Sequence, residues 1–292
     1  MAKKRIGFIL GSGHMGKIHQ QHLEVQGIEV HPFDGIEDCH AFLRECKKYT
    51  QDPEASYFVL IATPASTHYE YVKSALEHGL DVFVEKPLAT SLADAEELIQ
   101  FAKEHQRLLF VGHSEYYSNA FEKSKPFFLD LCKQFSLESL SFVRYNAPSE
   151  RGKDVSTVWD IGVHDYALFY GLKQIAQFTD WRKVQVTFDE DRDSAYPIRM
   201  IYATFHGKDR SRPFWRLDLN PSHSITLKTH KGSVQIPTDA STDAISNEQR
   251  EFLRLLDLPL AEREKEMFLN LEVARFAVQT AELYSTRPNS PK

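Results

Sequence analysis

The sequence predicts an α/β domain built on a parallel sheet, followed by a second part of the chain that is rich in strands. Apolar strand-like runs alternate with helical segments in the first part, which is typical of βαβ units with right-handed crossovers. A glycine-rich turn, Gly11–Gly16, joins the first strand to the first helix. From about Leu137 to Ile236, strand-like segments instead follow one another with turns between them.

Apolar runs and helix boundary signals define the elements of the α/β domain. The run Tyr57–Thr63 is continuously apolar, as expected for a strand buried on both faces. Gly79 suits the C′ position of one helix, and Ser91 can cap the next, with Asp94 as the acidic partner of a capping box. The expected strands are Arg5–Leu10, Ile28–Phe33, Tyr57–Thr63, Asp81–Glu85 and Leu108–Val111. The expected helices are His14–Gln26, Asp38–Lys48, Thr67–His78 and Ser91–His105.

The second part combines strands with a few helices. Alternating apolar and polar residues in Val184–Phe188 indicate a sheet with one covered face. A helical insertion, Trp159–Tyr170, interrupts the strands, and Ser246–Leu256 and Glu262–Ser285 form two closing helices. The expected strands are Leu140–Tyr145, Val184–Phe188, Arg199–Phe205, Phe214–Leu219, Ser224–Thr229 and Ser233–Ile236.

Composition and charge exclude several classes of protein. The chain has 292 residues and a net charge of −6, which gives no basic footprint for nucleic acid. Cys39, Cys46 and Cys132 show no metal-ligand spacing, so we expect no metal and a reducing compartment. The apolar run Ile6–Leu10 is too short for a signal peptide, and no later run is long enough to span a bilayer. We therefore expect a cytoplasmic protein with neither a membrane nor a nucleic-acid partner.

The glycine-rich turn has the pattern of a dinucleotide-binding loop. Gly11 permits a tight turn, Gly13 lets the backbone approach a pyrophosphate, and Gly16 lets the helix pack closely on the strand. A glycine-rich turn without a ligand is the alternative. The predicted cofactor-binding residues of this turn are Gly11, Ser12, Gly13, His14, Met15 and Gly16.

Asp34 ends the second expected strand, where a carboxylate can accept hydrogen bonds from the ribose 2′-hydroxyl of NAD. It would repel the 2′-phosphate of NADP, and no Lys or Arg follows before Arg44. We therefore predict NAD as the cofactor, with NADP as the alternative. A plain turn before Gly35 is the other interpretation of Asp34.

Polar residues also follow the next two strands, at the edge where open α/β sheets bind ligands. The predicted cofactor-binding residues of these segments are Thr63, Pro64, His68, Glu85 and Lys86. Thr63 and Pro64 are expected near the nicotinamide ribose, and a structural role is the alternative for His68. Glu85 can pair with Lys86 or reach the nicotinamide end of the cofactor. The Lys86 ammonium can hydrogen-bond a substrate hydroxyl and lower its pKa, although a solvated charge is the alternative.

Asp160 and His164 are four residues apart in the helical insertion, so they are expected on one helix face. Histidine titrates near neutral pH and suits a group that takes a hydroxyl proton while hydride leaves the same carbon. Half of a metal site and a structural histidine are the alternatives, and Asp165 is expected to be structural.

These motifs together resemble the Gfo/Idh/MocA oxidoreductases, the family of glucose–fructose oxidoreductase and inositol dehydrogenase. The resemblance rests on Gly11–Gly16, Ala62-Thr63-Pro64, Thr67-His68, Glu85-Lys86-Pro87 and Asp160 with His164-Asp165. It implies a Rossmann domain followed by an α+β domain with an open, mostly antiparallel sheet. We place the nucleotide-binding domain at residues 1–120 and the substrate-binding and oligomerisation domain at residues 121–292.

The resemblance also implies a function. The protein is expected to be an NAD(P)-dependent dehydrogenase that moves hydride between nicotinamide and a sugar, cyclitol or related polyol, as a homodimer or homotetramer. His164 would be the acid/base, Lys86 would orient the reacting hydroxyl, and Asp160 would support them. A tight-cofactor epimerase or eliminase and a catalytically silent dinucleotide-binding regulatory protein are the alternatives.

The chain departs from the family pattern at Ala167, where many members have an aspartate, and its C-terminal half is short for the family. These departures leave the identity of the substrate open. Candidate substrate contacts are Tyr116, Tyr117, Asn119, Arg144, Arg151 and Asp154.

Overall fold

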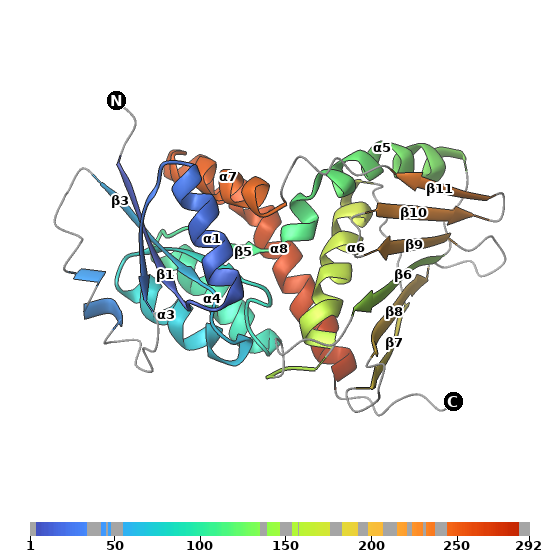
Figure 1. Ribbon diagram of the computed structural model, residues 1–292, viewed down its shortest axis with the longest axis horizontal. Helices are drawn as coiled ribbons and strands as arrows, with labels where there is room; N and C mark the ends of the chain where they lie inside the picture. Colours follow the sequence, from blue (N-terminus) through green and yellow to red (C-terminus); the bar gives the residue numbers. More distant parts are fainter. Residues whose placement is uncertain are drawn as a thin grey trace. The chain divides into compact units, whose positions relative to one another are not determined.

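The chain divides into two compact units, Met1–His113 with Ile245–Val278, and Ser114–Ala244 with Gln279–Lys292. Figure 1 shows the elements of each in a computed structural model. None of the helices among the described residues is long and apolar enough to cross a membrane. The residues described are 4–33, 42–44, 46–47, 55–134, 139–146, 154–156, 158–175, 183–191, 198–206, 215–220, 224–229, 232–236 and 244–285.

The first unit is built on a five-stranded sheet in which all strands are parallel. The sheet order is β2-β1-β3-β4-β5. Because the strands are parallel, the segments that follow β1, β3 and β4 all lie at the edge of the sheet formed by the carboxyl ends of the strands. Pro32 lies in β2. This strand is at the edge of the sheet and therefore tolerates the backbone N–H donor that proline lacks. The strands are β1 (Arg5–Leu10), β2 (Glu29–Phe33), β3 (Ser56–Ile61), β4 (Asp81–Glu85) and β5 (Leu109–Gly112).

Helices pack on this parallel sheet (Figure 1). They are α1 (His14–Val25), α3 (His68–Glu77), α4 (Leu92–Glu104), α7 (Ala244–Leu256) and the part of α8 (Leu260–Ser285) up to Val278. The Ser91 hydroxyl accepts a hydrogen bond from the Asp94 N–H at 3.1 Å, which confirms the predicted N-cap. Gly79 ends α3 with a φ of +75°, as expected for a C′ glycine. Residues 42–44 and 46–47 are helical, and the rest of the predicted helix Asp38–Lys48 lies outside the described residues.

Four aromatic rings form the centre of the first core. Phe252 of α7 lies 5.1 Å from Phe58, 5.5 Å from Phe83 and 5.8 Å from Phe110, measured between ring centroids. The Phe58 ring fits over Gly7, where an added Cβ would lie 2.7 Å from it. Helix α7 is therefore part of the core of the parallel sheet, although it lies far from the strands in the sequence.

Helix α8 covers the β5 edge of the sheet. Asn270 donates its side-chain N–H to the Val111 carbonyl at 3.0 Å and accepts from the Val111 N–H at 2.9 Å. Asn270 is only 5% exposed, so these hydrogen bonds are buried. They satisfy the backbone N–H and C=O of Val111 on the edge strand β5, which would otherwise be buried without partners.

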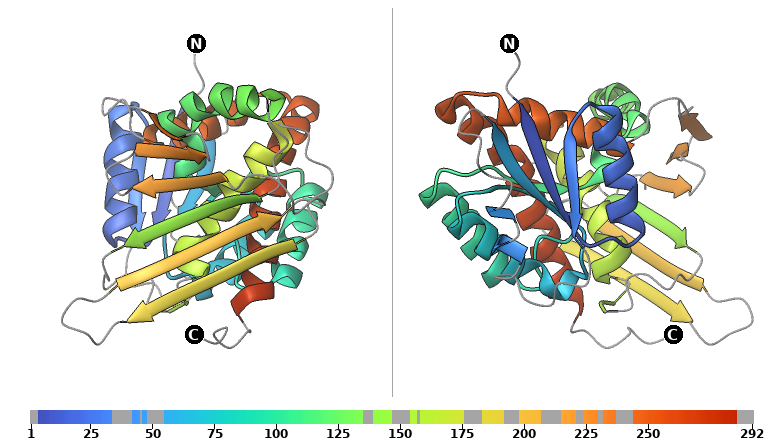
Figure 2. Two further views of the ribbon diagram at one scale, coloured as in Figure 1. Left: turned by 90° about the vertical axis from the view of Figure 1, so that its right-hand side faces the viewer. Right: turned by 60° about the vertical axis from the view of Figure 1, so that its left-hand side comes forward.

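The second unit contains a six-stranded sheet of order β11-β10-β9-β6-β8-β7. Strand β6 pairs antiparallel with β8 and parallel with β9, so the sheet is mixed. Helices α5 (Asn119–Gln134) and α6 (Val163–Ile175) lie on one face of it (Figure 2). The strands are β6 (Ser139–Asn146), β7 (Lys183–Asp191), β8 (Ile198–His206), β9 (Trp215–Asn220), β10 (Ser224–Thr229) and β11 (Gly232–Ile236).

The predicted fold class, a Rossmann domain followed by an α+β domain with an open, mostly antiparallel sheet, is wrong and needs correction. The fold that the structure supports is a Rossmann-like fold whose five-stranded sheet is all parallel. The two parts also do not simply follow each other, because the chain returns to the first unit at Ile245. The physical reason is that hydrophobic periodicity identifies a helix but does not specify which sheet it packs against.

Helix α5 is an element that the sequence reasoning missed. It contains Pro126, which lacks a backbone donor and normally ends or kinks a helix. The signal that could have revealed it is Ser118, whose hydroxyl accepts from the Phe121 N–H at 3.1 Å as a helix cap does.

We predict that Asn270→Leu destabilises the protein, because it leaves both backbone groups of Val111 buried without partners. The expected loss in the free energy of unfolding is about 2–4 kcal/mol, measured by urea denaturation. Gln100→Ala on the exposed face of α4 is the matched control and should change stability by less than about 0.5 kcal/mol. Equal stability of the Asn270→Leu variant and the wild type would contradict the assigned edge pairing.

Candidate functional site

The glycine-rich turn lies between β1 and α1 and is tightly constrained at two positions. Gly11 has a φ of +102°, and its N–H donates to the Phe33 carbonyl at 3.0 Å. A Cβ added to Gly16 would lie 1.8 Å from the Gly11 carbonyl oxygen. Both positions therefore require glycine, which allows the first turn of α1 to pack directly against the loop.

Gly13 differs from these two glycines because space is open in front of it. A Cβ added there would meet no atom within 4 Å. Gly13 is the N-cap of α1, no side chain among the described residues caps this helix end, and its first turn carries no acidic residue. The first N–H groups of a helix that has neither a side-chain cap nor an acidic first turn are suited to bind a phosphate. The turn thus fits the pyrophosphate of a dinucleotide.

The segment after β3 is held by hydrogen bonds of its own. The Thr67 hydroxyl donates to the Pro64 carbonyl at 2.7 Å and lies 2.8 Å from the Thr63 hydroxyl. His68 is 1% exposed, and its ring nitrogens lie 2.7 Å from the Pro87 carbonyl oxygen and 3.0 Å from the Thr63 carbonyl oxygen. His68 therefore links the segment after β3 to the segment after β4.

Glu85 and Lys86 stand at the end of β4. Glu85 is buried, and its Oε2 accepts from the Lys86 N–H at 3.2 Å. Lys86 is half-buried, and the Lys86–Pro87 peptide bond is cis. With Pro87 bound to His68, both neighbours of Lys86 are held in place at the edge of the sheet where the glycine-rich turn lies.

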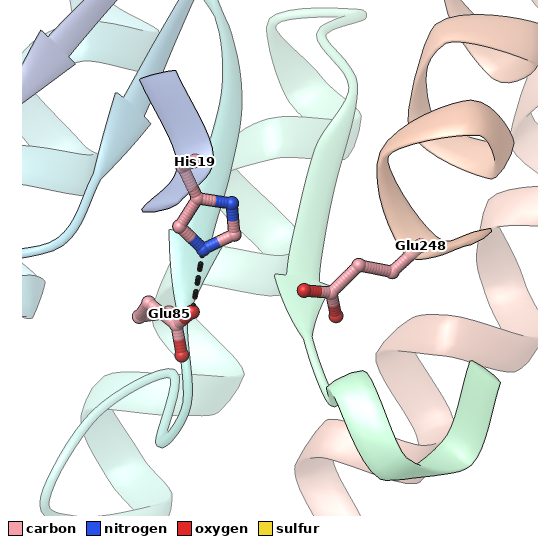
Figure 3. Close-up of side chains that lie close together, drawn as sticks. All are labelled: His19, Glu85 and Glu248. Atoms are coloured by element: carbon pink, nitrogen blue, oxygen red, sulfur yellow. Dashed lines mark hydrogen bonds and ion pairs between the residues drawn. The ribbon is translucent and has the colours of Figure 1, made fainter. Parts of the chain in front are cut away.

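The sequence reasoning missed His19 of α1, which is fully buried. Its Nε2 lies 2.7 Å from Oε1 of Glu85, and Glu248 of α7 contributes a second buried carboxylate nearby (Figure 3). The sequence signal was the position of His19 one turn after Gly16, on the same face of the helix as the core residue Leu23.

The second unit holds the other predicted site residues that are described. Tyr116 and Tyr117 lie in the 3-10 helix η2 (Ser114–Tyr117), and the Tyr116 ring packs on Gly171 of α6. Burial, with smaller contributions from Glu122 and Tyr170, raises the pKa of Tyr116 to about 12. Its phenol therefore stays protonated near neutral pH and can act as a hydrogen-bond donor but not as a base.

Asp160 and His164 lie in one continuous helical segment. Asp160 belongs to a π-helical turn, η3 (Val158–Gly162), and His164 to the first turn of α6. Both side chains are half-buried, whereas Asp165 is fully buried. Short π-helical turns are rare and occur often at functional sites.

The remaining predicted residues carry less structural information. Asp154 is exposed, and Asn119 begins α5. Arg144 lies in β6. Asp34 and Arg151 lie outside the described residues.

Comparison with known proteins finds a family match for the first part of the chain. Residues 6–113 match the family model described as "Oxidoreductase family, NAD-binding Rossmann fold". This part of the chain is therefore similar to the Gfo/Idh/MocA oxidoreductases. The matched residues include the glycine-rich turn and the segments after β3 and β4.

Curated relatives match over short segments. A 2,7-anhydro-N-acetylneuraminate hydratase of Mediterraneibacter gnavus is 43% identical over 63 residues, which are 22% of this chain and 16% of the relative. A scyllo-inositol 2-dehydrogenase (NADP⁺) of Bacillus subtilis is 29% identical over 133 residues, which are 42% of this chain and 36% of the relative. The matches thus span well under half the length of either relative.

A solved structure is similar over nearly the whole chain. It is the WlbA dehydrogenase from Thermus thermophilus in complex with NAD and UDP-GlcNAcA, with a TM-score of 0.65 and 16% identity. The similarity covers 99% of this chain and 97% of that one. At this identity it shows the fold alone, and it supports the Rossmann-like assignment.

We predict that two glycine variants separate cofactor binding from folding. Gly13→Ala should leave the melting temperature unchanged but weaken NADH binding by about tenfold or more, because the new methyl group occupies the space reserved for the pyrophosphate. Gly16→Ala should lower the melting temperature by several degrees, roughly the effect of a 2 kcal/mol loss, because of the clash with Gly11. Fluorescence titration and thermal denaturation measure the two effects, and wild-type NADH affinity of Gly13→Ala would contradict the assignment.

Proposed function

We propose that this protein is an NAD(P)-dependent dehydrogenase that oxidises a secondary alcohol of a sugar, cyclitol or related polyol, or reduces the corresponding ketone. The observation that carries the proposal is the edge of the parallel sheet in the first unit. There the glycine-rich turn, with open space at Gly13, and the constrained Lys86 follow strands of the same sheet. A cofactor bound along this edge would bring its nicotinamide end toward Lys86.

The proposed chemistry divides between three residues of the chain. Lys86 donates a hydrogen bond to the substrate oxygen and stabilises negative charge that develops on it. His164 accepts the hydroxyl proton at a ring nitrogen as the carbon is oxidised, and returns a proton in the reverse direction. Asp160 orients His164. Bound NAD(P) supplies the hydride acceptor or donor.

The substrate class is supported by the relatives and by the second unit. The relatives' names include an inositol dehydrogenase and a hydratase of a sialic acid derivative. We propose that Tyr116, Tyr117, Arg151 and Asp154 contribute polar contacts to a hydroxyl-rich substrate. The protonated phenol of Tyr116 suits a donor to a substrate hydroxyl.

We predict that Lys86→Ala and His164→Ala each lower turnover by about 100-fold or more while NADH affinity stays within about threefold. Turnover is followed by NADH absorbance over a panel of polyols and sugars. Lys123→Ala and His105→Ala, which alter exposed side chains, are the matched controls and should keep wild-type turnover. If either active-site variant turned over an identified substrate as the wild type does, its role would be wrong.

We also propose that NAD is preferred over NADP, on the basis of the carboxylate of Asp34. Asp34→Ser should remove the repulsion of the 2′-phosphate and shift the ratio of NADH to NADPH affinity toward NADPH by about tenfold. Parallel titrations with both nucleotides test this. An unchanged ratio would show that Asp34 is a turn residue.

A second candidate is an epimerase or eliminase that keeps its cofactor bound. Such an enzyme first oxidises and then reduces the same substrate, so the reaction has no net redox change. The specific observation in its favour is the hydratase among the curated relatives. Cofactor that remains bound through gel filtration, together with substrate conversion without net NADH formation, would identify this reaction and displace the simple dehydrogenase.

We propose further that the chain assembles into a homodimer or homotetramer. Helices α5 and α6 lie on one face of the six-stranded sheet, and among the described residues of that unit no helix covers the opposite face (Figure 2). A sheet face left open in this way is suited to pack against a second copy.

A further inference from the structure

The buried cluster of His19, Glu85 and Glu248 is the feature of the first unit that the proposed chemistry does not use (Figure 3). One ligand atom from each residue lies within 4.8 Å of the others, a composition that also suits a metal ion. Two ligands of one zinc ion would lie about 3.3 Å apart or more, given bonds of about 2.0 Å. The 2.7 Å between His19 Nε2 and Glu85 Oε1 is instead the length of a hydrogen bond to a carboxylate.

Gln249 of α7 determines which nitrogen of His19 carries the proton. Its side-chain oxygen accepts from the Gln26 side chain at 2.9 Å, so its amide nitrogen must face His19. That nitrogen donates to the His19 carbonyl at 3.1 Å and lies 2.9 Å from His19 Nδ1. Nδ1 is therefore an acceptor, and the ring proton lies on Nε2, where it is donated to Glu85.

Glu85 transmits this constraint to Lys86. Its Oε1 accepts from His19, and its Oε2 accepts from the Lys86 N–H at 3.2 Å. Both oxygens of one buried carboxylate are thus engaged, one by a helix and one by the backbone of the next residue. A carboxylate held at two points limits the directions in which the Lys86 backbone, and hence its side chain, can move.

We infer that His19 is a positioning residue for Lys86, with its tautomer set by Gln249. The network runs from α7 through α1 to the end of β4, and every residue in it belongs to the first unit. The inference rests on the proposed function, since it gives Lys86 its orientation for contact with substrate. It goes beyond that function because it assigns a role to Gln26, Gln249 and His19.

The first test compares hydrogen exchange at the Lys86 amide in three variants and needs no activity. His19→Leu keeps the volume but removes the donor, and should speed exchange of the Lys86 N–H by about tenfold. His19→Gln keeps a side-chain N–H and should leave exchange near wild type. His22→Leu, on the same helix, is the matched control. Unchanged exchange in His19→Leu, or equal acceleration in His19→Gln, would overturn the positioning role.

The second test reads the tautomer. Nitrogen-15 NMR of the histidine rings, with the His19 signals assigned by their loss in His19→Gln, should report the proton on Nε2. Gln249→Met removes the donor to Nδ1 and should allow the other tautomer to appear. A proton on Nδ1 in the wild type would overturn the inferred network.

The third test separates failure of the inference from failure of the proposed function. With an identified substrate, His19→Leu should lower kcat by about 10- to 100-fold with a smaller change in KM, and His19→Gln should restore most of it. Glu85→Gln combined with His19→Leu should be no worse than Glu85→Gln alone, because both act through one carboxylate. If the loss of kcat in the double variant equalled the product of the losses in the two single variants, the inference would be overturned. Absence of any dinucleotide binding in the wild type would instead reject the proposed function and leave the exchange and tautomer results to decide the network.

Discussion

The hydrogen bond between His19 and Glu85 joins the two segments on which the candidate site depends. His19 lies one turn after the glycine-rich loop, and Glu85 directly precedes Lys86. At 2.7 Å and fully buried on the histidine side, the bond fixes α1 relative to the end of β4. His68 holds the other side of the same segment through the Pro87 carbonyl. The helix that follows the glycine-rich turn and the segment that carries Lys86 are therefore connected by direct protein contacts.

The C-terminal helices complete this arrangement. Phe252 fills the core beneath the sheet, Asn270 pairs the edge of β5, and Gln249 sets the His19 tautomer. All three residues lie far beyond residue 113, where the match to the family model ends. The parallel sheet thus depends for its packing, and Lys86 in the inferred network depends for its position, on helices that come much later in the chain.

The sequence predicted the local features of the fold well and the long-range features poorly. The strand Asp81–Glu85 and the caps at Ser91 and Gly79 follow from residues close together in the chain, and the structure confirms them. The fold class was wrong because apolar periodicity identifies strands but does not specify the direction in which they pair. The constraint at Gly16 could be predicted from its motif, whereas the bond from His19 to Glu85 joins residues 66 positions apart and leaves no local pattern.

A crystal structure of the protein with NADH bound tests the central claim most directly. The expected result is a pyrophosphate against the N–H groups of the turn at Gly13, with the nicotinamide ring within contact distance of the Lys86 side chain and the bond from His19 to Glu85 intact. A dinucleotide bound away from this edge of the sheet, or a nicotinamide ring turned away from Lys86, would contradict it.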